Sequence, residues 1–381
     1  MSTNTRIYVS KDESLYLVSE PQTLPVTAYW RGVTWGADKF VAVADKSPAT
    51  AAYSSDGILW NQSELPENAA YWDVAYGHGR FVATAWQVPL SYSEDGINWQ
   101  YVESDCGAYN WSPITFGNGR FVAVARSNAK AIYSTDGINW TITDTPMAAD
   151  WFSMVYGNGK FVAVGMGSSK ALSSPDGITW TAATIIPSLT SYSDTDYRTI
   201  AFGNGKFVVL HCSKALGAYS EDGITWTEMT IPEGTWRALD FNNGVFTALS
   251  SDNAKTMYSF DGINWEYGSM PIESSWIAIT HNDKQFVAVA YNSKHFAYSY
   301  DGITWKHTHD FIRQNDEDIT NDIKDTLGLK QLAATIPTAL PNPNALTING
   351  ISYDGSAPID ITEAVKSLLE TELGVIENGT Y

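Results

Sequence analysis

The sequence predicts an all-β protein in which seven like units, each of four short antiparallel strands, close into a ring. The phrase Ser-x-Asp-Gly-x-x-Trp occurs seven times, and its aspartates follow one another at intervals of 39 to 46 residues. Tight turns of the form Gly-x-Gly precede four of the copies, and 29 glycines with 13% aromatic residues suit short strands joined by tight turns. A repeat near forty residues marks a repeat architecture. Together these observations predict a seven-bladed β-propeller.

The second copy shows the strands expected in each unit. Residues 72–76 form a first strand, 77–79 a tight turn, 80–84 a second strand and 90–93 a third, and a fourth strand begins at Ile97. Three other copies carry Gly-Asn-Gly at the first turn, at residues 117–119, 157–159 and 203–205. Asn-Gly permits the positive φ angles of a two-residue hairpin turn. Radial closure of such units would leave few exposed sheet edges.

The repeated aspartates are expected to be structural. Each carboxylate can accept hydrogen bonds from amides of its own turn, the glycine takes a conformation that a side chain would forbid, and the tryptophan can pack against a sheet. All seven copies are equivalent, whereas an active site occurs once, so we favour this role over catalysis or metal binding. The aspartates are Asp56, Asp95, Asp136, Asp176, Asp222, Asp261 and Asp301.

We expect four parts along the chain. They are an N-terminal hairpin or arm at 1–27, the propeller at 28–310, a linker with an amphipathic helix at 311–334, and an assembly or attachment segment at 335–381 that contains a short helix. The alternating residues 6–10 and 14–18 indicate the hairpin, which could close the ring or contact a neighbour. Ile319, Ile323 and Leu327, four residues apart, indicate the linker helix.

The face opposite the repeated turns, here called the top face, is the expected binding face because the copies differ there. An aromatic residue opens each first strand and could form a rim that stacks on sugar rings; the alternative, which we favour, is packing between blades. These residues are Trp30, Trp72, Trp111, Trp151, Tyr197, Trp236 and Trp276. Arg31, Arg198 and Arg237 follow three of them and could hold a carboxylate or phosphate; the alternative, which we favour, is that they are scattered surface residues.

The longest interval between copies, Asp176 to Asp222, contains extra residues at 185–196, including Tyr192. An insertion on the variable face is a candidate contact loop, although it could equally be a tolerated excursion.

Composition excludes several functions. A net charge of −19 argues against nucleic-acid binding, where a basic surface is expected. No run of eighteen apolar residues exists, so we expect a soluble chain without membrane insertion. The only cysteines, Cys106 and Cys212, are expected to be reduced thiols. The six histidines lack metal-ligand spacing, and neither a phosphate-binding loop nor a nucleophile elbow is present, so we expect no metal, cofactor or catalytic residue.

Two segments carry resemblances. The Ser-x-Asp-Gly-x-x-Trp phrase resembles the Asp box of sialidases and related propellers, with one residue fewer between Asp and Gly. Residues 339–356, Ala-Leu-Pro-Asn-Pro-Asn-Ala-Leu-Thr-Ile-Asn-Gly-Ile-Ser-Tyr-Asp-Gly-Ser, resemble a segment of bacteriophage tail fibres and related tail proteins. The second resemblance implies a location in the virion tail after synthesis in the host cytoplasm, other tail proteins as partners, and a homotrimer.

These observations favour a non-enzymatic structural and binding component of a phage tail. Its propeller would contact a host-surface glycan or protein, and a trimer would gain avidity. One alternative is a decoration or scaffold protein without a host ligand. The other is a sialidase-like glycosidase, which would need two carboxylates about the scissile bond. Acidic residues such as Asp73 and Asp196 occur on the top face, but the sequence marks out no pair.

Overall fold

The computed structural model describes residues 6–9, 15–18, 23–46, 48–66, 69–107, 109–166, 169–185, 196–307, 346–348 and 351–353. The chain divides into two compact units, Thr23–His307 and the combination of Met1–Gln22 with Thr308–Tyr381. The expected helices at 311–334 and near the C-terminus, and Tyr192, lie outside the described residues.

The second of these units contains two described hairpin pairs. Strand β1 (Arg6–Val9) pairs antiparallel with β2 (Leu15–Val18), as expected for the N-terminal arm. Strand β30 (Leu346–Ile348) pairs antiparallel with β31 (Ile351–Tyr353), inside the segment that resembles tail fibres.

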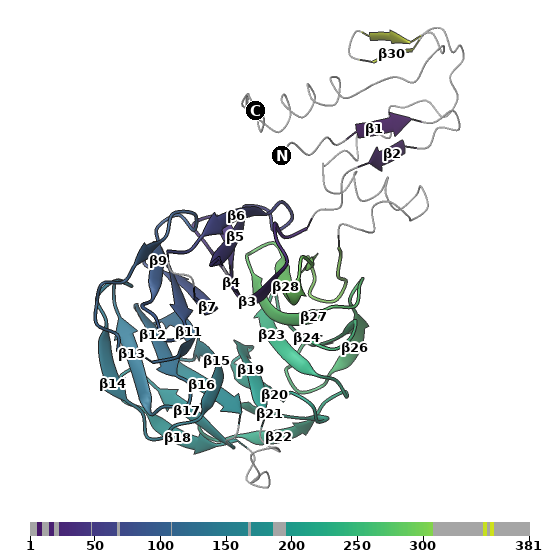
Figure 1. The fold of residues 1–381 in the computed structure, drawn as a ribbon. Helices are drawn as coiled ribbons and strands as arrows, with labels where there is room; N and C mark the ends of the chain where they lie inside the picture. The colour runs from purple at the N-terminus through teal and green to yellow at the C-terminus, as the bar shows by residue number, and fades with distance from the viewer. Residues whose placement is uncertain are drawn as a thin grey trace. The chain divides into compact units, whose positions relative to one another are not determined.

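The Thr23–His307 unit is a ring of antiparallel sheets in which the chain runs from the centre outward (Figure 1). The first strands are β3 (Ala28–Gly36), β7 (Tyr71–Gly77), β11 (Trp111–Gly117), β15 (Asp150–Gly157), β19 (Tyr197–Gly203), β23 (Trp236–Asn242) and β27 (Ser275–His281). The second strands are β4 (Lys39–Asp45), β8 (Arg80–Ala85), β12 (Arg120–Ala125), β16 (Lys160–Met166), β20 (Lys206–His211), β24 (Val245–Ser250) and β28 (Phe286–Ser293).

The outer strands complete the sheets. The third strands are β5 (Thr50–Ser54), β9 (Ser91–Ser93), β13 (Lys130–Ser134), β17 (Lys170–Ser174), β21 (Leu216–Ser220), β25 (Lys255–Ser259) and β29 (Phe296–Ser299). The fourth strands are β6 (Asn61–Glu64), β10 (Gln100–Tyr101), β14 (Thr141–Asp144), β18 (Thr181–Thr184), β22 (Thr227–Thr230) and β26 (Glu266–Ser269). Outside β29, a single bridge between Tyr298 and Lys306 stands where the other blades have a fourth strand.

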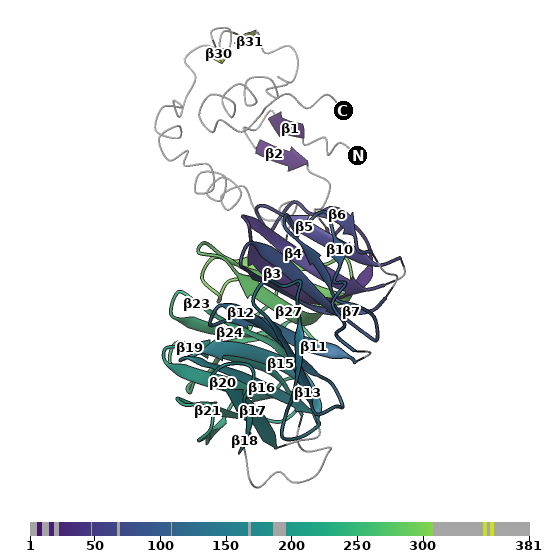
Figure 2. The same cartoon turned by 90° about the vertical axis from the view of Figure 1, so that its left-hand side faces the viewer.

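Each first strand contacts the first strands on either side, and β27 contacts β3, so the ring is closed. The edge-on view in Figure 2 shows the blades side by side. The unit is therefore an all-β propeller of six to seven four-stranded antiparallel blades, in agreement with the predicted fold class.

Burial explains the sequence pattern of the strands. Second strands read as continuous apolar runs, such as Phe40–Ala44, because neighbouring blades cover both of their faces. Fourth strands are mostly exposed, as in Thr141–Asp144, because they form the outer rim. The apolar core lies between blades: one cluster joins Val82 of the second blade to Trp111 and Phe121 of the third.

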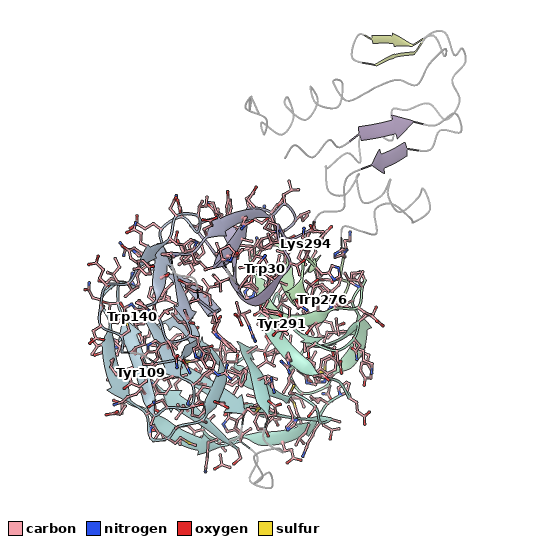
Figure 3. All side chains as sticks on the ribbon, in the orientation of Figure 1. Trp30, Tyr109, Trp140, Trp276, Tyr291 and Lys294 are labelled. Atoms are coloured by element: carbon pink, nitrogen blue, oxygen red, sulfur yellow. The ribbon has the colours of Figure 1, made fainter. Side chains whose placement is uncertain are left out.

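Closure of the ring joins its last sheet to its first. Tyr29 and Ala28 of β3 pair with Tyr291 and Ser293 of β28, which makes one seven-stranded sheet from both blades. The Trp30 indole donates a hydrogen bond to the Ser293 carbonyl at 3.1 Å, and the rings of Tyr29 and Tyr291 stack at 4.7 Å. Figure 3 labels Trp30 and Tyr291 at this junction.

The repeated Asp-Gly turns have the expected hydrogen bonds in every copy. In the second copy, Asp95 Oδ1 accepts from the amides of Ile97 and Asn98, both at 2.8 Å, and from the Ser93 hydroxyl at 2.9 Å. Gly96, at φ +74°, donates its amide to Ser93. Partial burial raises the pKa of Asp95, but these hydrogen bonds outweigh it and lower the pKa to about 2.

The same turns link one blade to the next. Arg80 donates to the carbonyl of Asp136 at 3.1 Å, and Arg120 donates to that of Asp176 at 3.0 Å. Asn118, at φ +47° in the first hairpin turn, donates its side-chain amide to the Pro175 carbonyl of the following blade at 3.4 Å. The first turns and the Asp-Gly turns therefore lie on one face, as predicted, and serve there as structural contacts.

Candidate ligand-binding site

Every first strand of the ring contains a bulge one residue after its opening aromatic residue. The register against the second strand shifts there in each blade, for example between Trp30 and Gly32 and between Trp236 and Ala238. A bulge changes the direction of the extra side chain, which no longer follows the alternation of side chains between the two faces of the sheet. The bulged positions are Arg31, Trp72, Ser112, Phe152, Arg198, Arg237 and Ile277.

This register corrects the sequence alignment of the second blade. Tyr71, not Trp72, occupies the position of Trp30, because Tyr71 pairs with Ala85 as Trp30 pairs with Ala44. Trp72 therefore corresponds to Arg31. Counting back from the valines that follow, Val33 and Val74, would have revealed this alignment in the sequence.

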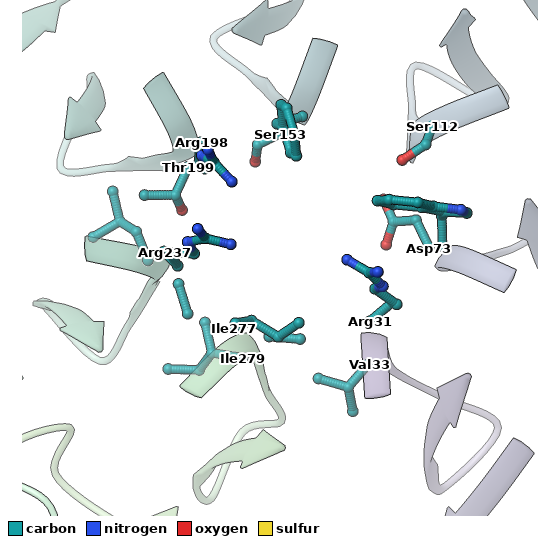
Figure 4. A pocket seen from close by; sticks show the side chains of 16 residues that line it. Arg31, Val33, Asp73, Ser112, Ser153, Arg198, Thr199, Arg237, Ile277 and Ile279 are labelled. Carbon is teal, nitrogen blue, oxygen red and sulfur yellow. The ribbon is translucent and has the colours of Figure 1, made fainter. Parts of the chain in front are cut away.

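All seven bulged residues line one cavity of about 170 Å³ at the top end of the central channel, here called the channel-mouth cavity. Figure 4 shows Arg31, Arg198 and Arg237 reaching it from three separate blades, with Ser112 and Ile277 between them. The favoured interpretation of these arginines as scattered surface residues is therefore wrong, because the first strands of three blades bring them to one cavity.

The hypothesis of an aromatic rim, the less favoured of the two interpretations, is wrong for six of its seven members. The six have 0% exposed surface because neighbouring blades cover them, so none can present a face to a sugar ring; they are Trp30, Trp111, Trp151, Tyr197, Trp236 and Trp276. They belong to the apolar core between blades, the alternative favoured above. Trp72 alone lines the cavity, together with Phe152, which was not among the candidate ligand-binding residues.

Guanidinium groups stack on the two aromatic rings of the cavity. The Arg31 guanidinium carbon lies 4.1 Å from the centre of the Trp72 ring, and that of Arg126 lies 4.5 Å from the same ring. Arg126 also lies 4.1 Å from the Phe152 ring, and Arg198 lies 4.9 Å from it. The order Arg31, Trp72, Arg126, Phe152, Arg198 is a continuous cation–π series.

Arg126 was missed by the sequence analysis. It follows β12 directly on the top face, where nothing in the repeat distinguishes it.

The arginines differ in their carboxylate partners. Arg31 Nη2 donates to Asp45 Oδ2 at 3.2 Å, and Arg198 Nε donates to Asp196 Oδ1 at 2.6 Å. Arg237 has no carboxylate partner within the described part of the chain. The cavity lining thus contains three arginines, two of which are ion-paired with carboxylates.

Asp73 is the carboxylate that lines the cavity. Its oxygens accept hydrogen bonds from the amides of Val74 at 2.9 Å and Ile114, in the next blade, at 3.0 Å. Burial raises the pKa of Asp73 to about 6, and the two amide hydrogen bonds offset only part of this effect. Asp73 is therefore mainly ionised at neutral pH and becomes neutral in mild acid.

No cluster of three metal-ligating side chains occurs among the described residues. The described part of the chain also contains no helix with the length and hydropathy needed to cross a lipid bilayer. Cys106 and Cys212 are buried free thiols, as expected.

No protein-family model matches the chain, and no curated protein sequence matches it. Similar solved structures include virginiamycin B lyase from Staphylococcus aureus, with 12% identity, a TM-score of 0.63 and coverage of 72% of this chain and 96% of that one. YCF48 bound to D1 peptide has 14% identity, a TM-score of 0.59 and coverage of 75% and 94%. The WD40 propeller of Doa1 has 10% identity, a TM-score of 0.55 and coverage of 78% and 97%.

These similarities show that the chain has a β-propeller fold. They do not indicate its function, because propellers with unrelated functions share this fold.

Proposed function

We propose that the protein is a non-enzymatic binding component of a bacteriophage tail, whose propeller contacts a host-surface glycan or protein through its top face. The observation that carries the binding role is the convergence of three arginines from separate blades on the channel-mouth cavity. Side chains from different repeats can form one shared site on the ring axis, where a rigid scaffold positions them.

The tail assignment is supported by residues 339–356, which resemble tail-fibre segments. In this proposal the propeller is seven-bladed, with its Asp-box-like turns as architecture and the bridge between Tyr298 and Lys306 completing the last blade. Residues 335–381 provide assembly or attachment, and three chains associate into a trimer in the virion. A trimer of weak sites would bind a cell surface through avidity.

Adsorption of the purified full-length chain to bacterial cells tests the binding role. Labelled protein is mixed with a panel of candidate host strains, and the cell-bound fraction is measured with and without excess unlabelled protein. Saturable binding to some strains is expected. Absence of saturable binding to any strain that the phage infects would favour a decoration protein, and release of reducing sugar from the envelope would favour a glycosidase.

The mass of the full-length chain in solution tests the assembly role. Light scattering or native mass spectrometry should give three times the mass of one chain. A monomer at micromolar concentration would contradict the trimer.

A further inference from the structure

We propose that the channel-mouth cavity binds the carboxylate or phosphate group of an acidic sugar. Arg31, Arg198 and Arg237 would hold the oxyanion, and the indole N–H of Trp72 would donate a further hydrogen bond. This inference rests on the proposed function and specifies the ligand of that site.

Residues that line the cavity carry hydrogen-bond donors without a partner in the described part of the chain. Arg31 Nε, Arg237 Nε and Trp72 Nε1 are buried and have no hydrogen-bond partner among the described residues. Several buried donors elsewhere share this property, but these three belong to residues that line one cavity. A buried donor without an acceptor costs about 1–3 kcal/mol, so a ligand that brings acceptor oxygens would recover part of that cost.

The cation–π contacts favour recognition of an anion over stacking of a neutral sugar. Arg31 and Arg126 lie 4.1 and 4.5 Å from the centre of the Trp72 ring, so guanidinium groups occupy the ring surface that a sugar would need. Stacking uses the face of a guanidinium, whereas its N–H donors point outward in its plane. The aromatic rings thus orient the arginines. Arg31 Nη2 and Arg198 Nε already donate to Asp45 and Asp196, so the oxygens of a carboxylate or phosphate would accept from the other in-plane N–H groups.

The remaining lining suits the hydroxyl groups of a sugar. Ser112, Ser153 and Thr199 line the cavity between the charged residues, and hydroxyls both donate and accept hydrogen bonds. The cavity of about 170 Å³ has the volume of roughly five or six water molecules, which fits one sugar residue better than an extended chain. An acidic sugar at the end of a glycan combines both requirements.

Calorimetric titration of the full-length chain tests the inference directly. The probes are inorganic phosphate, glucuronate, acetate, and glucose as the uncharged counterpart of glucuronate. Glucuronate or phosphate should bind, and glucose should not. Arg237→Gln should weaken binding at least tenfold, because one charge-assisted contact contributes about 1.5–3 kcal/mol and 1.4 kcal/mol is a factor of ten. Arg120→Gln, which removes the same charge from the opposite face, should bind as the wild type does.

A second variant keeps the inference testable if Arg237→Gln fails to fold. Trp72→Phe keeps a ring for the arginines but removes the indole donor, and it should weaken binding about three- to tenfold. Preferential binding of phosphate or of glucuronate would identify the ligand as a phosphorylated or a carboxylated sugar. Equal affinity for acetate and glucuronate would overturn the assignment to a sugar. Equal affinity of wild type and both variants would overturn the site.

Cell adsorption separates this inference from the proposed function. If the wild type and Arg237→Gln adsorb equally to cells, host binding stands and the oxyanion site fails. If phosphate or glucuronate binds but no cells are bound, the site stands and host attachment fails.

Discussion

Replacing Asp95 with asparagine should destabilise the propeller at neutral pH. Asp95 Oδ1 accepts three hydrogen bonds, two of them from the amides of Ile97 and Asn98, and Oδ2 accepts one from the Asn98 side chain at 2.7 Å. Asparagine keeps one acceptor oxygen, loses the charge and places an NH₂ group against the Asn98 amide. The substitution therefore tests the charge and the second oxygen while leaving the shape of the turn nearly intact.

The magnitude follows from the shift in pKa. A fall from 3.8 to about 2 corresponds to about 2.4 kcal/mol at 1.36 kcal/mol per unit. Solvent screening of this partly exposed turn reduces the estimate to about 1–2 kcal/mol. Because the folded-state pKa lies below the unfolded value, the stabilisation is present above pH 3.8 and is lost as the pH falls through about 2.

Thermal unfolding of both proteins at pH 7, 4 and 2.5 measures the effect. We expect a decrease in Tm of about 2–5 °C at pH 7, and a smaller difference at pH 2.5. Glu94→Gln is the matched control, because Glu94 is 71% exposed and its contact with Arg80 contributes little. Equal Tm values at pH 7, or a difference that does not shrink in acid, would refute a stabilising carboxylate.

Gly117→Ala should cost about 2–4 kcal/mol in urea unfolding, since its Cβ would lie 2.0 Å from the Tyr156 ring of the next blade. Gly119→Ala, whose Cβ would meet only His78 at an ordinary 3.8 Å but whose φ is +71°, should cost about 1 kcal/mol; equal losses would contradict interblade packing as the cause. The raised pKa of Asp73 should make the wild type more stable as the pH falls from 6.5 to 4.5, by at most about 3 kcal/mol, and Asp73→Asn should lack this step. An unchanged pH profile would argue against a carboxylate whose pKa is raised by desolvation. Gln285→Ala removes the hydrogen bond from the last blade to a carbonyl of the first, so limited proteolysis should cut the ring faster at that junction than in the wild type, and equal rates would show that this contact does not secure closure.

The sequence alone was sufficient to predict the all-β propeller and the structural role of the repeated turns. Both follow from a local motif that recurs at a nearly constant interval. Asp95 and its counterparts hydrogen-bond residues two and three positions away, which the printed motif already contains. The continuous apolar second strands, such as Phe40–Ala44, are buried, and this pattern too can be seen in the printed sequence.

The binding surface depended on tertiary structure. The spacing to Val33 and Val74 separates the positions of Trp30 and Trp72 in the sequence. Only the tertiary structure shows that the position of Trp30 is fully buried and that the bulged position of Trp72 lines a cavity. No sequence pattern marked Arg126 as a site residue. Its guanidinium group stacks on Trp72 and Phe152, which belong to the blades on either side, and such a contact cannot be read from one repeat. A local motif fixes its own turn through short-range hydrogen bonds, whereas closure of the ring alone brings side chains from distant repeats to one axis.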